Sequence, residues 1–181
     1  MTAPANPGGA VGAPTPGVMR RMAAFLYEGV LVFGIVALSG LIYGIATQQR
    51  HALVGSTGLQ AFLFGVLGLY FAISWTRSGQ TLAMLTWHVR LVTVDGHPLR
   101  PLRAVARYLL AWMWFLPSLG LAQLLGLKGA GPVSMALLGW VLVYAALARL
   151  HTDRQFLHDA LCRTRLITWY PPHRARKQPA R

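Results

Sequence analysis

An arginine and an acid share one apolar stretch near the start of the chain. Arg20 and Arg21 precede a run to Ala46 that is apolar except for Glu28. At a rise of 1.5 Å per residue, Arg21 and Glu28 lie about 10 Å apart along a helix and on one face of it. A carboxylate at this depth of a bilayer is unfavourable by about 1–3 kcal/mol unless it is protonated, paired or hydrated. The position of Glu28 therefore needs a physical explanation.

Glu28 has a structural and a functional interpretation. In the first, it is half of a buried ion pair that clamps helix ends, with Arg21, or with Arg107 or Arg149 from other helices at the same depth. In the second, it titrates and passes a proton or a cation, as intramembrane acids often do. A lipid headgroup site or a solvated crevice is a third interpretation. In each case we expect the other helices to assemble around this segment.

A second polar cluster lies close to the end of the chain and has metal-ligating residue types. On a helix, His151, Gln155, His158 and Asp159 would fall near one face. Four nearby arginines would oppose a bound cation: Arg149, Arg154, Arg163 and Arg165. We therefore expect no metal site. We expect instead a hydrogen-bonded clamp between this tail helix and the loop that contains Gln80.

No motif of a catalytic site is present in the sequence. Cys162 is the single cysteine, which excludes an intrachain disulfide and a CxxC metal pair. Arg163 could lower the pKa of the Cys162 thiol, but no base or orienting group stands nearby. The chain also lacks a nucleophile elbow, a phosphate loop and a zincin helix. We expect neither an enzyme nor a cofactor.

The composition indicates an integral membrane protein. Of 181 residues, 55% are hydrophobic and 12% are charged, about half the usual charged fraction of a soluble domain. Seventeen basic residues against four acidic ones give a net charge of +13. The basic residues cluster at the ends of apolar runs and in the tail, which is the positive-inside pattern and attracts anionic lipid headgroups. No recognition motif for nucleic acid accompanies the charge, so a nucleic-acid partner is not expected.

Four apolar runs predict an all-α membrane protein with four transmembrane helices. They cover residues 20–46, 59–75, 108–127 and 132–148; the second run is short, at about 17 residues, but adequate for a hydrocarbon layer of about 30 Å. Pro117 interrupts the third run and predicts a kink there. The basic segment 77–107 and both termini would lie inside, whereas the two outer loops carry only Arg50 and Lys128.

A small cytoplasmic strand and helix cap is predicted beside the spans. Residues 89–94 alternate apolar and polar side chains and stop at Asp95-Gly96, which indicates a strand followed by a turn. Residues 164–170 form a second strand, whose most economical partner is the first. Thr152 or Asp153 could cap a short helix that ends at Leu161.

The segments outside the membrane domain have their own compositions. Residues 1–17 contain mainly Pro, Gly and Ala and predict a disordered leader, residues 18–168 form the membrane domain, and residues 169–181 form a basic tail. Gly40 and Gly44 form a GxxxG motif on the first span. This motif permits close helix contact within one chain or between copies, so a homo-oligomer is among the partners considered.

Several of these features occur in an order that resembles the RDD family of small bacterial membrane proteins. They are Arg21 with an acid seven residues later, Gly79-Gln80-Thr81-Leu82, the strand ending in Asp95-Gly96, Arg107-Tyr108 opening a span, and residues 155–161 followed by Thr164. The resemblance covers residues 18–168. It implies that Arg21, Glu28 and Asp159 match the arginine and the two aspartates for which the family is named. Two departures are Glu for Asp at position 28 and Ala83-Met84 where many members have Gly-Lys.

The resemblance implies a multi-pass protein of the bacterial inner membrane, and some members of the family have been linked to ion transport. Two functions follow as expectations. The first is transport, or assistance of transport, of a small ion or solute, with Glu28 as the titrating group and with Arg21 and Asp159 setting its pKa and orientation. The second is a non-catalytic scaffold in which the same charges are structural. Residues expected to pair with or support this cluster are Arg107, Arg149, Gln80 and His158.

Overall fold

The computed structural model describes residues 13–48, 56–150 and 156–170, without the side chains at 56 and 148–150. Four segments in this part of the chain are long and apolar enough to cross a membrane: 18–46, 57–77, 101–124 and 130–147. The long helices are α2 (Val18–Ala46), α3 (Ser56–Arg77), α5 (Pro101–Ala111), α6 (Leu116–Leu124) and α7 (Ala130–Leu150). The short elements are α4 (Leu82–Thr86), β1 (Val89–Thr93), η1 (Trp112–Trp114), α8 (Leu157–Leu161) and β2 (Thr164–Thr168). The predicted fold class is confirmed.

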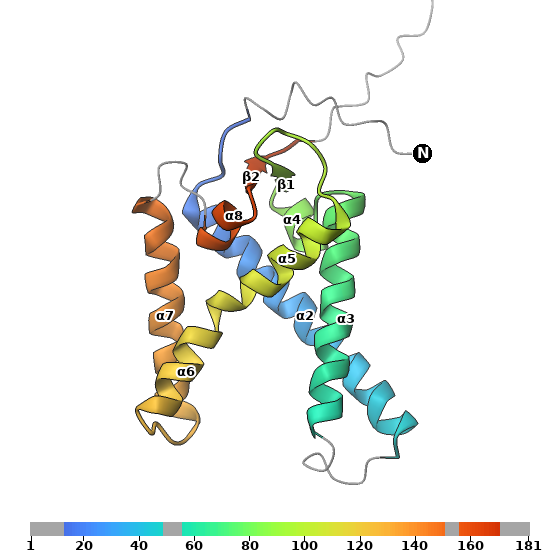
Figure 1. Ribbon diagram of the computed structural model, residues 1–181, viewed down its shortest axis with the longest axis vertical. Coiled ribbons are helices and arrows are strands. Elements are labelled where there is room, and N and C mark those ends of the chain that lie inside the picture. Colours follow the sequence, from blue (N-terminus) through green and yellow to red (C-terminus); the bar gives the residue numbers. More distant parts are fainter. Residues whose placement is uncertain (1–12, 49–55, 151–155, 171–181) are drawn as a thin grey trace, which may run out of the picture.

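The long helices form a splayed bundle, in which α2 and α5 cross near the centre (Figure 1). Helix α3 packs against α2 and α5 on one side, and α6 packs against α7 on the other. The short elements α4, α8, β1 and β2 gather at one end, where α2 and α5 begin and α3 and α7 end (Figure 1). We refer to these four short elements as the cap.

The third span differs from the prediction at both its start and its interruption. Helix α5 begins at Pro101 rather than Tyr108, because a proline in the first turn lacks an N–H that would have no partner in any case. The helix then gives way to the 3₁₀ turn η1, and α6 begins at Leu116. Pro117 lies in the first turn of α6. The interruption is therefore a break at residues 112–115 and not a kink at Pro117.

The predicted pairing of the two strands is confirmed. Strands β1 and β2 are antiparallel, with Val89 opposite Thr168 and Thr93 opposite Thr164. A two-stranded sheet alone is marginally stable in water. Here Val89 and Leu91 from β1 are buried in a core with Trp75, Tyr108 and other apolar side chains, so the sheet is stabilised by packing.

Three other predicted features are the caps of the tail helix, the leader and the GxxxG motif, and the first two lie wholly or partly outside the described residues. Helix α8 is described from Leu157, and the proposed caps Thr152 and Asp153 fall in the undescribed range 151–155. In the predicted leader, the carbonyl of Pro14 accepts a hydrogen bond from the amide of Thr168 at 2.9 Å. At the GxxxG motif, a Cβ added to Gly40 or Gly44 would meet no atom within 4 Å. Neither glycine therefore serves a close contact within the described part of this chain.

Candidate functional site

Glu28 is held by two hydroxyl groups from different elements. The hydroxyl of Tyr70, on α3, donates to Oε1 at 2.8 Å, and the hydroxyl of Thr81 donates to Oε2. No basic side chain in the described part of the chain lies within 4.0 Å of the Glu28 carboxylate. The expected ion pair of Glu28 with Arg21 or Arg107 is therefore wrong, and the side chain of Arg149 lies outside the described residues.

The Gly79-Gln80-Thr81 segment positions one of these hydroxyls. Gly79 has φ +70°, and a Cβ there would come within 2.7 Å of the Leu91 carbonyl oxygen, so glycine is required. The side-chain Nε2 of Gln80 donates to the Val89 carbonyl at 2.7 Å, which joins the segment to β1. Thr81 is the N-cap of α4 and accepts a hydrogen bond from the Met84 amide at 3.2 Å. Gln80 thus supports the segment through β1 and not through the charged cluster.

Asp159 is the carboxylate that pairs with an arginine. Its Oδ1 lies 2.6 Å from Nη2 and 2.8 Å from Nε of Arg107, and its side chain is fully buried. The Arg107 guanidinium also lies over the ring of Trp75, 4.3 Å from the centroid. This pair joins α8 to α5. It replaces the predicted clamp between the tail helix and the Gln80 loop, because Arg107 projects toward α8 and takes up the acid there.

His158 extends the same network toward α7. Burial lowers the pKa of His158 to about 4, an effect that the nearby Asp159 carboxylate opposes only in part. The ring is therefore neutral at pH 7, and its 3.6 Å contact with Asp159 is not an ion pair. Nε2 lies 3.5 Å from Arg107 Nη2, which can only donate, so we assign the ring proton to Nδ1. Nδ1 then donates to the Tyr144 hydroxyl at 2.9 Å.

Arg21 is buried but has no hydrogen-bonding partner among the described residues. The residue is 3% exposed, and none of its three guanidinium nitrogens finds an acceptor there. The guanidinium lies over the ring of Phe156, 4.5 Å from the centroid. It is within electrostatic range of Asp159 but makes no ion pair with it. Arg21 is thus the unneutralised cation of the cluster.

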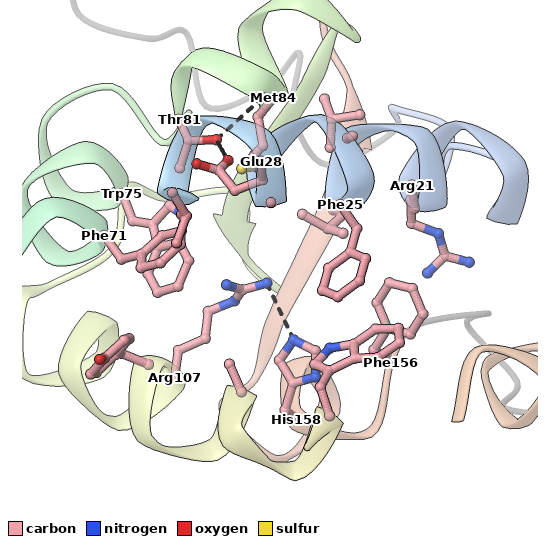
Figure 2. A pocket seen from close by; sticks show the side chains of 18 of the residues that line it. Arg21, Phe25, Glu28, Phe71, Trp75, Thr81, Met84, Arg107, Phe156 and His158 are labelled. Atoms are coloured by element: carbon pink, nitrogen blue, oxygen red, sulfur yellow. Dashed lines mark hydrogen bonds between the residues drawn. The ribbon is translucent and has the colours of Figure 1, made fainter. Parts of the chain in front are cut away.

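A cavity of about 560 Å³ brings most of these residues together. Arg21 and Glu28 line it from α2, Arg107 from α5 and His158 from α8, with aromatic rings between them (Figure 2). Asp159 and Gln80 are not among the lining residues. The cavity therefore holds two of the three predicted cluster residues, and the third acts on it through Arg107.

Two other sequence expectations concern metal binding and thiol chemistry. Within the described ranges, no group of three or more His, Cys, Asp or Glu side chains is arranged to hold a metal ion. His151 and Asp153 lie outside those ranges. Burial raises the pKa of the Cys162 thiol, which is the opposite of the lowering suggested by the neighbouring Arg163. Such a thiol is a poor nucleophile at neutral pH.

Sequence reasoning missed the hydroxyl partners of Glu28 and the tyrosine that binds His158. Thr81 could have been found, since it belongs to the Gly79-Gln80-Thr81 segment that the family resemblance singles out. Tyr70 and Tyr144 are polar groups within apolar spans, where an unpaired hydroxyl is costly, and that is the only signal they offer.

The comparisons with known proteins bear on the whole membrane domain. No curated protein and no solved structure matches the sequence. The model of the RDD family matches residues 15–163, a range that includes every element from α2 to α8 and all the residues of the cluster. The chain is therefore a member of the RDD family and carries its membrane domain over most of its length.

Proposed function

We propose that this protein carries, or helps to carry, a small ion or solute across the bacterial inner membrane, with Glu28 as the titrating group. The observation that carries the proposal is a carboxylate that lines a cavity and that, among the described residues, is bound only by hydroxyls. A hydroxyl can donate to a carboxylate and accept from a carboxylic acid. Tyr70 and Thr81 can therefore remain hydrogen-bonded to Glu28 in both protonation states.

Asp159 is suited to a different task. Its partner is a guanidinium, which has donors and no acceptor, so a protonated Asp159 would lose part of its bonding. Asp159 is also fully buried and is not among the cavity-lining residues. In the proposed mechanism Asp159 holds Arg107 in position, while Glu28 accepts and releases the proton or cation.

The orientation proposed for the protein places the cap in the cytoplasm. Among described residues, the arginines at 20, 21, 77, 90, 100, 103, 107, 163 and 165 lie at the cap end of the spans or within the cap. The opposite ends carry Lys128. This distribution supports a cytoplasmic cap by the positive-inside rule, and an even number of spans brings both termini to that side. The basic cap end would then face anionic lipid headgroups.

Flux measurements on proteoliposomes test the proposal. Vesicles that contain an internal pH dye receive a pH jump or a sodium gradient, and we expect flux that Glu28→Gln abolishes and Glu28→Asp retains in part. Asp95→Asn, in an exposed turn, is the control because it removes one carboxylate that does not line the cavity. Normal pH- and sodium-dependent flux in Glu28→Gln would contradict the proposal.

The second candidate is a non-catalytic scaffold or assembly partner, and the buried Arg107–Asp159 pair is the observation that favours it. Such a pair fixes the relative position of two elements and needs no solute. Under this alternative, Glu28→Gln lowers the melting temperature of the detergent-solubilised protein, and neither the wild-type protein nor the variant supports flux.

A further inference from the structure

We propose that the cavity binds a single-chain anionic amphiphile, with its carboxylate or phosphate head at Arg21 and its apolar body along the aromatic wall. This inference rests on the proposed function in one respect, that the cavity is the solute site. It goes further by naming the chemical class of the solute. Four features of the cavity support it: an unsatisfied cation, a carboxylate at the other end, an apolar wall and an opening on the membrane side.

The unsatisfied cation is Arg21. Buried guanidinium groups are normally hydrogen-bonded, and each nitrogen left without an acceptor is unfavourable. Arg21 is 3% exposed, lines the cavity and finds no acceptor among the described residues. By contrast, Arg107, the other cavity-lining arginine, already binds Asp159. A carboxylate or phosphate matches the forked donors of a guanidinium with two parallel hydrogen bonds.

Glu28 gives the cavity a direction. It lies seven positions after Arg21 on helix α2, about 10 Å along the axis, and the two side chains form no ion pair. Figure 2 shows both side chains on α2, with Phe25 between them. An anionic head is attracted to the Arg21 end and repelled from the Glu28 end. The same arrangement disfavours a ligand that has anionic groups at both ends.

The wall between the two charges is aromatic and apolar. Rings of Phe25, Phe71, Trp112, Trp114 and Phe115 line the cavity. Phe25 stacks on Trp114, with ring centroids 4.7 Å apart. A volume of about 560 Å³ lies in the range of small-molecule sites, which are mostly apolar with a few polar groups that orient the ligand. An inorganic anion would leave this wall unused, whereas an alkyl chain would cover it.

The cavity also opens toward the lipid-facing side of α2. Leu26 and Gly29 both line it, yet Leu26 is 66% exposed and Gly29 is exposed. Both residues belong to a segment long and apolar enough to span the membrane. A ligand with an apolar body could therefore enter from the bilayer, with its head following toward Arg21.

Binding is measured with the full-length protein in nanodiscs of zwitterionic lipid, by calorimetry and by thermal shift. The probes are dodecanoate and dodecyl phosphate, with dodecyltrimethylammonium as the cationic match, and acetate and inorganic phosphate as heads without a tail. We expect the two anionic amphiphiles to bind at least tenfold more tightly than the other probes. Equal binding of the cationic amphiphile, or equal protection by inorganic phosphate alone, would overturn the inference.

Two variants locate the site. Arg21→Gln should weaken dodecanoate binding at least tenfold. Its control is Arg20→Gln, which removes the same charge from the adjacent position; Arg20 does not line the cavity, so dodecanoate binding should be unchanged. If Arg21→Gln does not fold, Gly29→Leu serves instead. A Cβ at Gly29 meets no atom within 4 Å, so the backbone tolerates a side chain there, and we expect the leucine to narrow the opening. Unchanged dodecanoate binding in Gly29→Leu would count against the site.

Further measurements separate the sources of the ligand and the two proposals. Native mass spectrometry of the protein from membranes distinguishes a co-purifying single-chain lipid from a soluble organic anion by the mass released. If dodecanoate fails to bind while Glu28-dependent proton flux persists, the inference fails and the proposed function stands. If dodecanoate binds and no flux is found, the inference stands and the transport proposal fails.

Discussion

The substitution Asp159→Asn tests whether the buried ion pair holds the cap to the spans. Asparagine has nearly the same shape as aspartate, so the change removes a charge without creating a cavity. Arg107 would then keep its contact with the Trp75 ring but lose its only ion-pair partner among the described residues. A buried guanidinium without a counter-charge is the unfavourable consequence.

The expected loss of stability in Asp159→Asn follows from the geometry of the ion pair. Two unit charges 2.6 Å apart attract by about 6 kcal/mol at an effective dielectric constant of about 20. Much of that attraction offsets the cost of desolvating both ions, so the pair itself contributes far less. Removal of one partner typically costs about 3–5 kcal/mol because the other charge stays buried. The side-chain oxygen of asparagine can still accept a hydrogen bond from Arg107, so we expect a loss near the lower limit, about 3 kcal/mol.

The free energy of unfolding is measured by reversible unfolding in mixed micelles. A separate thermal melting experiment, monitored by fluorescence size-exclusion chromatography, gives the melting temperature. The control Asp95→Asn removes a carboxylate from an exposed turn and should change stability by less than about 0.5 kcal/mol. The double variant Arg107→Met with Asp159→Leu replaces both ions by apolar groups and should recover most of the loss. Equal stabilities of Asp159→Asn and Asp95→Asn, or a double variant less stable than Asp159→Asn, would refute the reasoning.

Two further predictions concern pH and the Gly79 turn. The folded-state pKa of His158 is about 4 against about 6.5 when unfolded, so the unfolded chain binds the proton more readily between these values. His158 therefore contributes about 3 kcal/mol of stability above pH 6.5, and this contribution is lost as the pH falls toward 4. The free energy of unfolding, plotted against pH over this range, should rise with a slope that His158→Gln flattens. An unaltered slope in His158→Gln would exclude His158 as its source. Gly79→Ala should lower stability by about 1–3 kcal/mol because φ is +70° and the new Cβ meets the Leu91 carbonyl. Gly40→Ala is the control, because a Cβ on this helical glycine meets no atom within 4 Å, and it should be neutral or stabilising in the same melting assay. Equal effects of the two substitutions would contradict the claim that position 79 requires glycine.

The spans and the strand pair could be predicted from the sequence because they depend on local patterns. Long apolar runs must form helices in lipid, where backbone groups have no water to bind. The alternation at residues 89–94 and the Asp95-Gly96 turn likewise specify a strand locally. The break at residues 112–115 is different: Pro117 indicated a disturbance, but a helix can end before a proline or bend at it, and tertiary packing selects between these outcomes.

The partners of the charged residues could not be predicted because they depend on how each helix is rotated about its axis. Arg107 lies at a depth from which it could have paired with Glu28 or with Asp159, and no pattern in the sequence distinguishes these two pairings. In the structure Arg107 projects toward α8, and Tyr70 turns its hydroxyl toward Glu28 instead. Hydropathy places a residue along the membrane normal, but it gives no information about the direction in which a side chain projects.

The charges of the cluster explain why the cavity is electrically asymmetric. Two arginines and two acids are present, and Arg107 with Asp159 forms the one ion pair among them. The remaining charges, Arg21 and Glu28, stand on one helix about 10 Å apart along its axis and make no ion pair with each other. The charges of Arg21 and Glu28 are therefore not neutralised by an ion pair within the cluster. A solute that supplies an anionic group at Arg21, or a cation or proton at Glu28, completes it, and this requirement links the buried pair in the fold to the proposed transport.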